Sequence, residues 1–375
     1  MIAKIVKNSG KIQPWFISYG LQRVNQVLRH NGRHKPIHIF ICICDHFEPL
    51  RGGVNNEIGL KRVKRWVADY KVIADRYKDI DGARPRHTIF YPIEEYRPQY
   101  MELLADFCRQ GYGEVEIHLH HDNDTADNLR RTLLDFKKLL SGEYGLLCRD
   151  RNNKEIKYGF IHGNWALDNS RKDGRKCGVN NELEILEQTG CYADFTMPSA
   201  PDETQISKIN SIYYAVDNPH KPGSHSRGIG VKDGKNSRKG LLMVQGPLML
   251  NWQNRKLGIF PRIENSEISY SSAITPERME LWRRANIHID GRPEYIFIKL
   301  YTHGCQDDNA RYMLNGGLDG LFSYFRDNYN NGDDFITHYM SSREMVNVIN
   351  SVEDGVIPVE INELRNYRLE KVENR

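Results

Sequence analysis

The stretch IHIFICIC, residues 37–44, decides the fold. It is almost continuously apolar and rich in β-branched residues, a composition typical of a strand that is buried on both faces of a parallel sheet. Six further runs of strand character follow along the chain: HTIFYP (87–92), EVEIHLH (114–120), IKYGFIH (156–162), ADFTMP (193–198), LLMVQGP (241–247) and YIFIKLY (295–301).

Helical patterns lie between most of these runs. Apolar residues recur at spacings of three and four over 59–77, 97–111, 128–142, 180–190 and 276–287. The patterns 97–111 and 128–142 both finish at a glycine, a common stop signal for a helix. Alternating strands and helices predict a parallel sheet, and seven such units predict an α/β barrel. An open doubly wound sheet is the alternative arrangement.

Three segments fall outside this alternation. Residues 1–35 form a basic, amphipathic amino-terminal extension that contains a helical pattern. We expect it either to pack against the barrel or to make a peripheral contact with a membrane or partner. The stretch from about 205 to 240 is rich in Gly, Ser, Lys and His, which predicts a long inserted loop. Residues 331–375 are expected to form a helical tail packed on the barrel.

Composition narrows the class of protein. The 375 residues are 39% hydrophobic and 27% charged, with a net charge of +4, which indicates a globular protein with no nucleic-acid partner. The amino terminus lacks the features of a signal peptide, so we expect a cytoplasmic location. The seven cysteines are odd in number and form no pair of CxxC motifs, which argues against a disulfide framework and a zinc ribbon.

Histidines and acids gather where the predicted strands end, and in parallel α/β folds these ends carry the functional site. His118 and His120 point to one face of their strand because side chains alternate, whereas His121 points to the other face and is expected to be structural. Imidazole and carboxylate ligands suit zinc. The other candidates at strand ends are Asp45, His46, Asp124, His162, Trp165 and His303.

These strand ends resemble the motifs of polysaccharide deacetylases, carbohydrate esterase family four of the glycoside hydrolase/deacetylase superfamily. In CDHFEP (44–49), Asp45 matches the family's catalytic base and His46 stands at a metal-ligand position. In EIHLHHDND (116–124), His120 matches the first metal-binding histidine. Asp124 occupies the place of the second, for which His118 is the alternative.

Two further motifs extend the resemblance. IKLYTHG (298–304) is similar to the family's last motif, which makes His303 the candidate general acid. The segment from His162 to Trp165 stands where the third motif lies but lacks its arginine, so only its location carries over. His162 and Trp165 are therefore expected to bind substrate, with Trp165 able to stack on a sugar ring.

The resemblance implies a fold and an activity. The fold is a distorted (β/α)7-type barrel over residues 36–330. The activity is hydrolysis of an N-acetyl group on a nucleotide- or lipid-linked sugar during surface polysaccharide biosynthesis, with a divalent metal, zinc first. One alternative is a glycoside hydrolase on the same barrel that uses Asp45 with Glu94 or Glu95. The other is a non-catalytic carbohydrate-binding relative.

Overall fold

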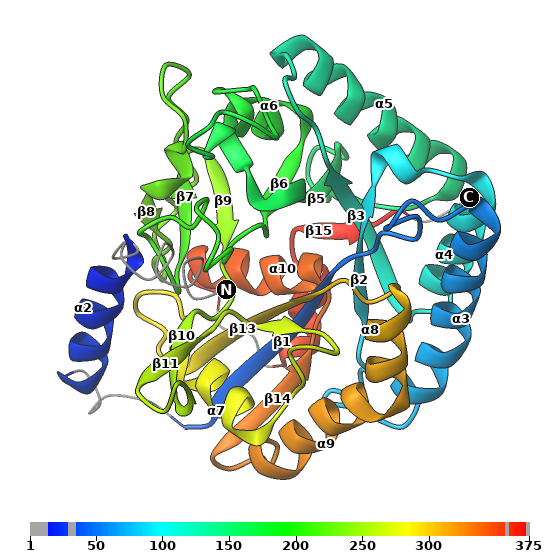
Figure 1. Cartoon of the computed structure of the whole chain (residues 1–375). Helices are drawn as coiled ribbons and strands as arrows, with labels where there is room; N and C mark the ends of the chain where they lie inside the picture. The colour runs from blue at the N-terminus through cyan, green and yellow to red at the C-terminus, as the bar shows by residue number, and fades with distance from the viewer. Residues whose placement is uncertain (1–13, 29–34, 357–359, 373–375) are drawn as a thin grey trace.

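The computed structural model describes residues 14–28, 35–356 and 360–372 and shows a mixed α/β protein with a large, mostly parallel sheet (Figure 1). Each of the seven predicted runs overlaps a strand, although ADFTMP (193–198) gives only its first two residues to β6. The strands lie parallel to their neighbours in the order β13-β1-β2-β3-β5-β6-β9. Their bounds are β1 Ile37–His46, β2 His87–Pro92, β3 Gly113–Leu119, β5 Ile156–His162, β6 Cys191–Asp194, β9 Leu241–Val244 and β13 Tyr295–Thr302.

The five predicted helices are present between these strands. They are α3 Asn56–Ala74, α4 Pro98–Arg109, α5 Ala126–Tyr144, α6 Glu182–Thr189 and α7 Pro276–Ala285, and α8 Asp307–Tyr312 and α9 Leu318–Tyr329 follow β13. Side chains of Asn55, Thr125 and Thr275 cap the first turns of α3, α5 and α7. One predicted end is wrong: α5 continues through Gly142 and stops at Gly145, whose φ of 62° gives the left-handed turn that ends the helix.

The sheet curls, and its two faces bury different residues. Phe40, Cys42 and Cys44 of β1 pack with α10 (Ser342–Glu353), whereas the alternate residues of β1 pack beneath the outer helices. The curl is strong enough for the Lys299 ammonium on β13 to donate a hydrogen bond to the carbonyl of Phe195, just after β6 (2.7 Å). Within the described residues, no hydrogen-bonded ladder joins β9 to β13.

The carboxy-terminal segment is part of the core. β14 (Phe335–Tyr339) pairs in parallel with the first half of β1, every residue of α10 is buried, and β15 (Leu369–Lys371) pairs with β4 (Cys148–Asp150). Arg343 on α10 binds Glu114, near the start of β3, at 2.7 Å. The expected helical tail therefore also supplies two strands, and its helix α10 covers the amino-terminal end of the strands. The carboxyl ends are left free to carry a site.

The remaining segments extend the sheet or pack on it. β7 (Ile212–Ala215) pairs antiparallel with β9 and with β8 (Ile229–Gly230), so the predicted insertion contains an ordered sheet edge. β10 (Met249–Lys256) and β11 (Phe260–Glu264) form a hairpin, and β12 (Glu267–Ile268) pairs with β13.

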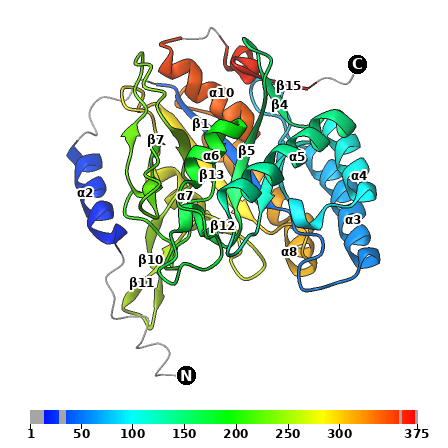
Figure 2. The same ribbon diagram turned by 90° about the horizontal axis from the view of Figure 1, so that it is seen from above.

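The amino-terminal helix α2 (Trp15–Leu28) lies at one side of the molecule (Figures 1 and 2). Its Trp15 is fully buried in a cluster with Ala200, Ile209 and Leu248. The rest of the predicted extension, residues 1–13 and 29–34, lies outside the described residues. In the described part of the chain, no helix is long and apolar enough to pass through a bilayer.

Candidate metal centre

Four of the predicted site residues meet at the carboxyl edge of the sheet. His118 and His120, at the end of β3, lie with Glu48, just after β1, and one donor atom from each falls within 4.8 Å of the others. The ring of His46 is centred 4.9 Å from that of His118 and 4.8 Å from that of His303. The structure thus gathers residues from β1, β3 and the end of β13.

Hydrogen bonds orient the two imidazoles toward the same carboxylate. His118 Nδ1 donates to the carbonyl of Ile161 at 2.8 Å, which leaves Nε2 buried, without a hydrogen-bond partner and 3.7 Å from Glu48 Oε1. His120 Nδ1 lies 2.5 Å from Glu94 Oε1, and its Nε2 lies 3.1 Å from Glu48 Oε1. A ligand histidine usually binds an oxygen through its other ring nitrogen in this way.

The centre holds groups whose pKa values are driven in opposite directions. Burial would raise the pKa of Glu48, but the neighbouring imidazoles of His118 and His120 hold it well below its usual range. Burial would lower the pKa of His120, yet its bonds to Glu48 and Glu94 raise it to about 9. Burial raises the pKa of Glu95 to about 7, although the N–H of Leu50 donates to its Oε2 at 2.6 Å. The site therefore contains one carboxylate that stays ionised, Glu48, and one carboxyl group with a pKa near neutrality, Glu95.

This donor set fits a divalent metal ion such as zinc. His118 Nε2 is a buried nitrogen that nothing else satisfies, and two imidazoles with one carboxylate form a ligand set known from catalytic zinc sites. Glu48 was not singled out from the sequence, although it lies in the CDHFEP motif three residues after Asp45. Its position just after β1, at the edge of the sheet where the other candidates gather, could have identified it as a ligand.

Asp45 lies on the other face of β1 from His46, because side chains alternate along a strand. Its carboxylate is fully buried, accepts the N–H of Gly304 at 2.7 Å and binds His87 Nε2 at 2.8 Å. These bonds tie β1 to β2 and to the loop that carries His303. Asp45 is thus placed to position that loop, and it was expected to contact a reacting water instead.

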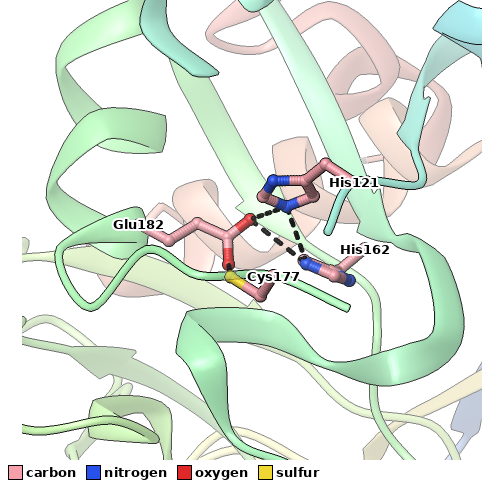
Figure 3. Close-up of side chains that lie close together, drawn as sticks. All are labelled: His121, His162, Cys177 and Glu182. Atoms are coloured by element: carbon pink, nitrogen blue, oxygen red, sulfur yellow. Dashed lines mark hydrogen bonds and ion pairs between the residues drawn. The ribbon is translucent and has the colours of Figure 1, made fainter. Parts of the chain in front are cut away.

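A second cluster contains His121, His162, Cys177 and Glu182 (Figure 3), whose donor atoms also lie within 4.8 Å of one another. Asp124, an expected ligand beside His120, binds His121 Nδ1 at 2.9 Å instead, because β3 ends at Leu119 and the chain turns. His121, expected to be a bystander, is central to this cluster.

The two expected substrate-binding residues are placed differently from one another. His162 is fully buried and faces His121, so it belongs to the second cluster and has no surface to offer a substrate. Trp165 is half-buried in the short helix η2 (Gly163–Trp165) that directly follows β5, and its indole N–H is buried without a partner. Only Trp165 keeps a placement compatible with the expected role.

A third group of donors, Asp79, Asp81 and His338, is already neutralised. Arg365 binds Asp79 at 2.8 Å and lies 3.4 Å from Asp81, while His338 binds Asp81 at 2.7 Å. The guanidinium group supplies the positive charge that a metal would bring. This group is therefore an ion-pair network that holds the carboxy-terminal segment.

No family model matches the chain, and no curated protein matches it. Among solved structures, it is similar to a GH57 branching enzyme from the hyperthermophilic archaeon Thermococcus kodakaraensis, with 9% identity over 81% of this chain and 73% of that one, at a TM-score of 0.37. At that score the likeness carries no weight for fold or activity.

Proposed function

We propose that this protein is a metal-dependent hydrolase whose centre is Glu48, His118 and His120, and that it removes an N-acetyl group from a sugar. The observation that carries the proposal is the convergence of two imidazole Nε2 atoms on one buried carboxylate oxygen, at 3.1 and 3.7 Å. A zinc ion held there would polarise a carbonyl group and make a water molecule more acidic.

In this proposal Glu95 carries out the proton transfers, and His303 only donates or accepts hydrogen bonds. Glu95, with a pKa of about 7, takes a proton at neutral pH and returns it to a leaving amine. Burial lowers the pKa of His303, so its imidazole is neutral and does not serve as the protonated acid that the sequence suggested. His303 acts in this proposal as a neutral hydrogen-bonding group, held in place through Asp45 and Gly304.

The sugar substrate rests on the order of the sequence motifs. CDHFEP, EIHLHHDND and IKLYTHG span the carboxyl ends of β1, β3 and β13, in the order of the deacetylase motifs. We therefore propose that the curled sheet is a distorted (β/α)7-type barrel, that Trp165 stacks on the sugar, and that the substrate is a nucleotide- or lipid-linked N-acetyl sugar. A cytoplasmic setting and a role in surface polysaccharide biosynthesis belong to the same proposal.

Glycoside hydrolysis is the second candidate, and one observation favours it. The environment drives the pKa of Glu48 down and that of Glu95 up, and such a separated pair is the usual basis for assigning a carboxylate and a general acid in glycosidases. This chemistry would need no metal.

Acetate and reducing-sugar release, measured in parallel on the purified full chain, test both candidates. The probes are a UDP-linked N-acetyl sugar and N-acetylglucosamine oligomers, with and without added zinc. We expect acetate release that a chelator abolishes and zinc restores, and that His118→Ala and His120→Ala remove. The matched control is His220→Ala, at an exposed position.

The other outcomes are equally informative. Metal-independent release of reducing sugar, lost in Glu95→Gln, would favour the glycosidase. A chain that binds no transition metal at this centre and releases neither product would overturn both candidates and leave a carbohydrate-binding role.

A further inference from the structure

We propose that His121, His162, Cys177 and Glu182 form a second zinc site, which is structural and independent of the proposed catalytic centre. The four residues come from four places in the fold: the turn after β3, the end of β5, the loop that follows η2, and the first turn of α6 (Figure 3). A metal ion there would fasten this loop to the carboxyl edge of the sheet.

The distances from Glu182 Oε1 to the two imidazole nitrogens match those between ligands of a tetrahedral zinc site. Zinc bonds of about 2.0–2.3 Å place the ligands of a tetrahedron roughly 3.3–3.8 Å apart. Glu182 Oε1 lies 3.3 Å from His121 Nε2 and 3.6 Å from His162 Nε2, and Cys177 Sγ lies 3.4 Å from Glu182 Oε2. The two Nε2 atoms are 2.8 Å apart and would separate slightly around an ion.

The protonation of the imidazoles leaves acceptors facing one another. His162 Nδ1 donates to the carbonyl of Gly163, and His121 Nδ1 donates to the carboxylate of Asp124. Unless one of the two Nε2 atoms carries a proton, their lone pairs point at each other and at Glu182 Oε1, which is buried. Converging acceptors in a buried space are costly unless a positive charge sits between them.

The sulfur of Cys177 is prepared to act as a ligand. It is fully buried and accepts the backbone N–H of Val179 at 3.4 Å. Burial raises the pKa of its thiol to about 11, so a bound metal ion would have to displace the thiol proton. The N–H of Asp168 donates to Glu182 Oε2 at 2.6 Å and fixes the direction of that carboxylate. One sulfur, two nitrogens and one oxygen select zinc over the hard cations calcium and magnesium.

The site would stabilise a loop that has little regular structure. Residues 163–181 hold only two short helical turns, and Asn164, Trp165, Asp168 and Asn169 all have left-handed φ angles between 52° and 56°. Such backbone persists only where its surroundings fix it. The loop begins at Gly163, which lies against the ring of His120. A zinc cross-link would therefore hold a loop that borders the proposed catalytic centre without supplying a ligand to it.

The rival arrangement is metal-free, with an imidazolium of His121 held between Asp124 and Glu182. Cobalt substitution separates the two, because only a site with a thiolate gives an intense sulfur-to-cobalt charge-transfer band. We expect this band in the cobalt-loaded full chain and in His118→Ala. It should disappear in Cys177→Ser and persist in the control Cys305→Ser, which removes another buried thiol.

Metal counting completes the test and keeps it apart from the proposed function. Mass spectrometry should find two zinc ions per wild-type chain and one in either Cys177→Ser or His118→Ala. A wild type that binds one zinc ion per chain, and whose cobalt form gives the sulfur-to-cobalt band, would contradict the proposed catalytic centre and support this second site. If Cys177→Ser does not fold, X-ray absorption on the wild-type zinc protein should still show a single sulfur ligand. A wild type without a sulfur ligand, or a band that survives Cys177→Ser, would overturn the proposal.

Discussion

Gly163→Ala should disable the proposed catalytic centre by displacing His120. A Cβ atom at Gly163 would lie 2.3 Å from His120 Cδ2 and 2.7 Å from the carbonyl oxygen of Leu119. Carbon atoms in contact are normally ~3.5–4.0 Å apart, so the ring must move by about 1.2 Å and the end of β3 by less. The φ of Gly163 lies outside the left-handed region, so the cost is steric alone.

Two quantities should respond to this substitution. Overpacking of this kind costs about 1–3 kcal/mol of unfolding free energy, and a displacement near 1 Å in a catalytic group lowers activity by about 10²-fold. Gly142→Ala is the matched control, because Gly142 is exposed within α5 and nothing lies near its added Cβ. We expect the control to gain about 0.5–1 kcal/mol.

Denaturant unfolding, zinc titration and acetate release, measured on both variants, check these expectations. The zinc affinity of the Glu48–His118–His120 centre should fall in Gly163→Ala and stay unchanged in Gly142→Ala. A Gly163→Ala protein with wild-type zinc affinity and activity would refute the reasoning, because His120 would then have no part in the centre.

Three further outcomes are expected. Glu95→Gln should remove the limb of the pH–rate profile near pH 7. Because folding raises the pKa of Glu95 from 4.5 to about 7, the wild type loses stability as the pH rises through 7 and this carboxyl group ionises. The variant should therefore be the more stable protein above pH 7 and equal to the wild type below pH 4.5. Arg343→Met should cost about 3–5 kcal/mol in denaturant unfolding, because it removes the bidentate ion pair from the buried Glu114 and leaves only Lys371, 3.3 Å away; a loss under 1 kcal/mol would contradict this. If α2 makes the expected membrane contact, Leu21→Asp on its exposed face should reduce flotation with anionic vesicles while the equally exposed Val72→Asp on α3 should not; a wild type that never floats would exclude the contact.

The strands were predictable because a strand that is buried on both faces is made almost entirely of apolar residues, a pattern visible in the strand's own sequence. IHIFICIC reads as a strand without knowledge of its neighbours, and the six later runs read in the same way. β14 was not predicted from the sequence because FITHY contains only a short apolar pattern inside a polar segment. Its place beside β1 follows from long-range pairing, with Ile37 opposite Phe335.

The sequence by itself determined the seven parallel strands and the gathering of His46, His118, His120 and His303 at one edge, because parallel strands bring their carboxyl ends together wherever they lie in the chain. Only the tertiary structure decided which donor residues belong to the Glu48–His118–His120 centre and which belong to the second cluster. Strand alternation turns Asp45 away from His46, and the turn after Leu119 sends His121 and Asp124 toward His162. Cys177 and Glu182 reach that cluster through a loop whose path depends on contacts distant in sequence, which no local pattern records.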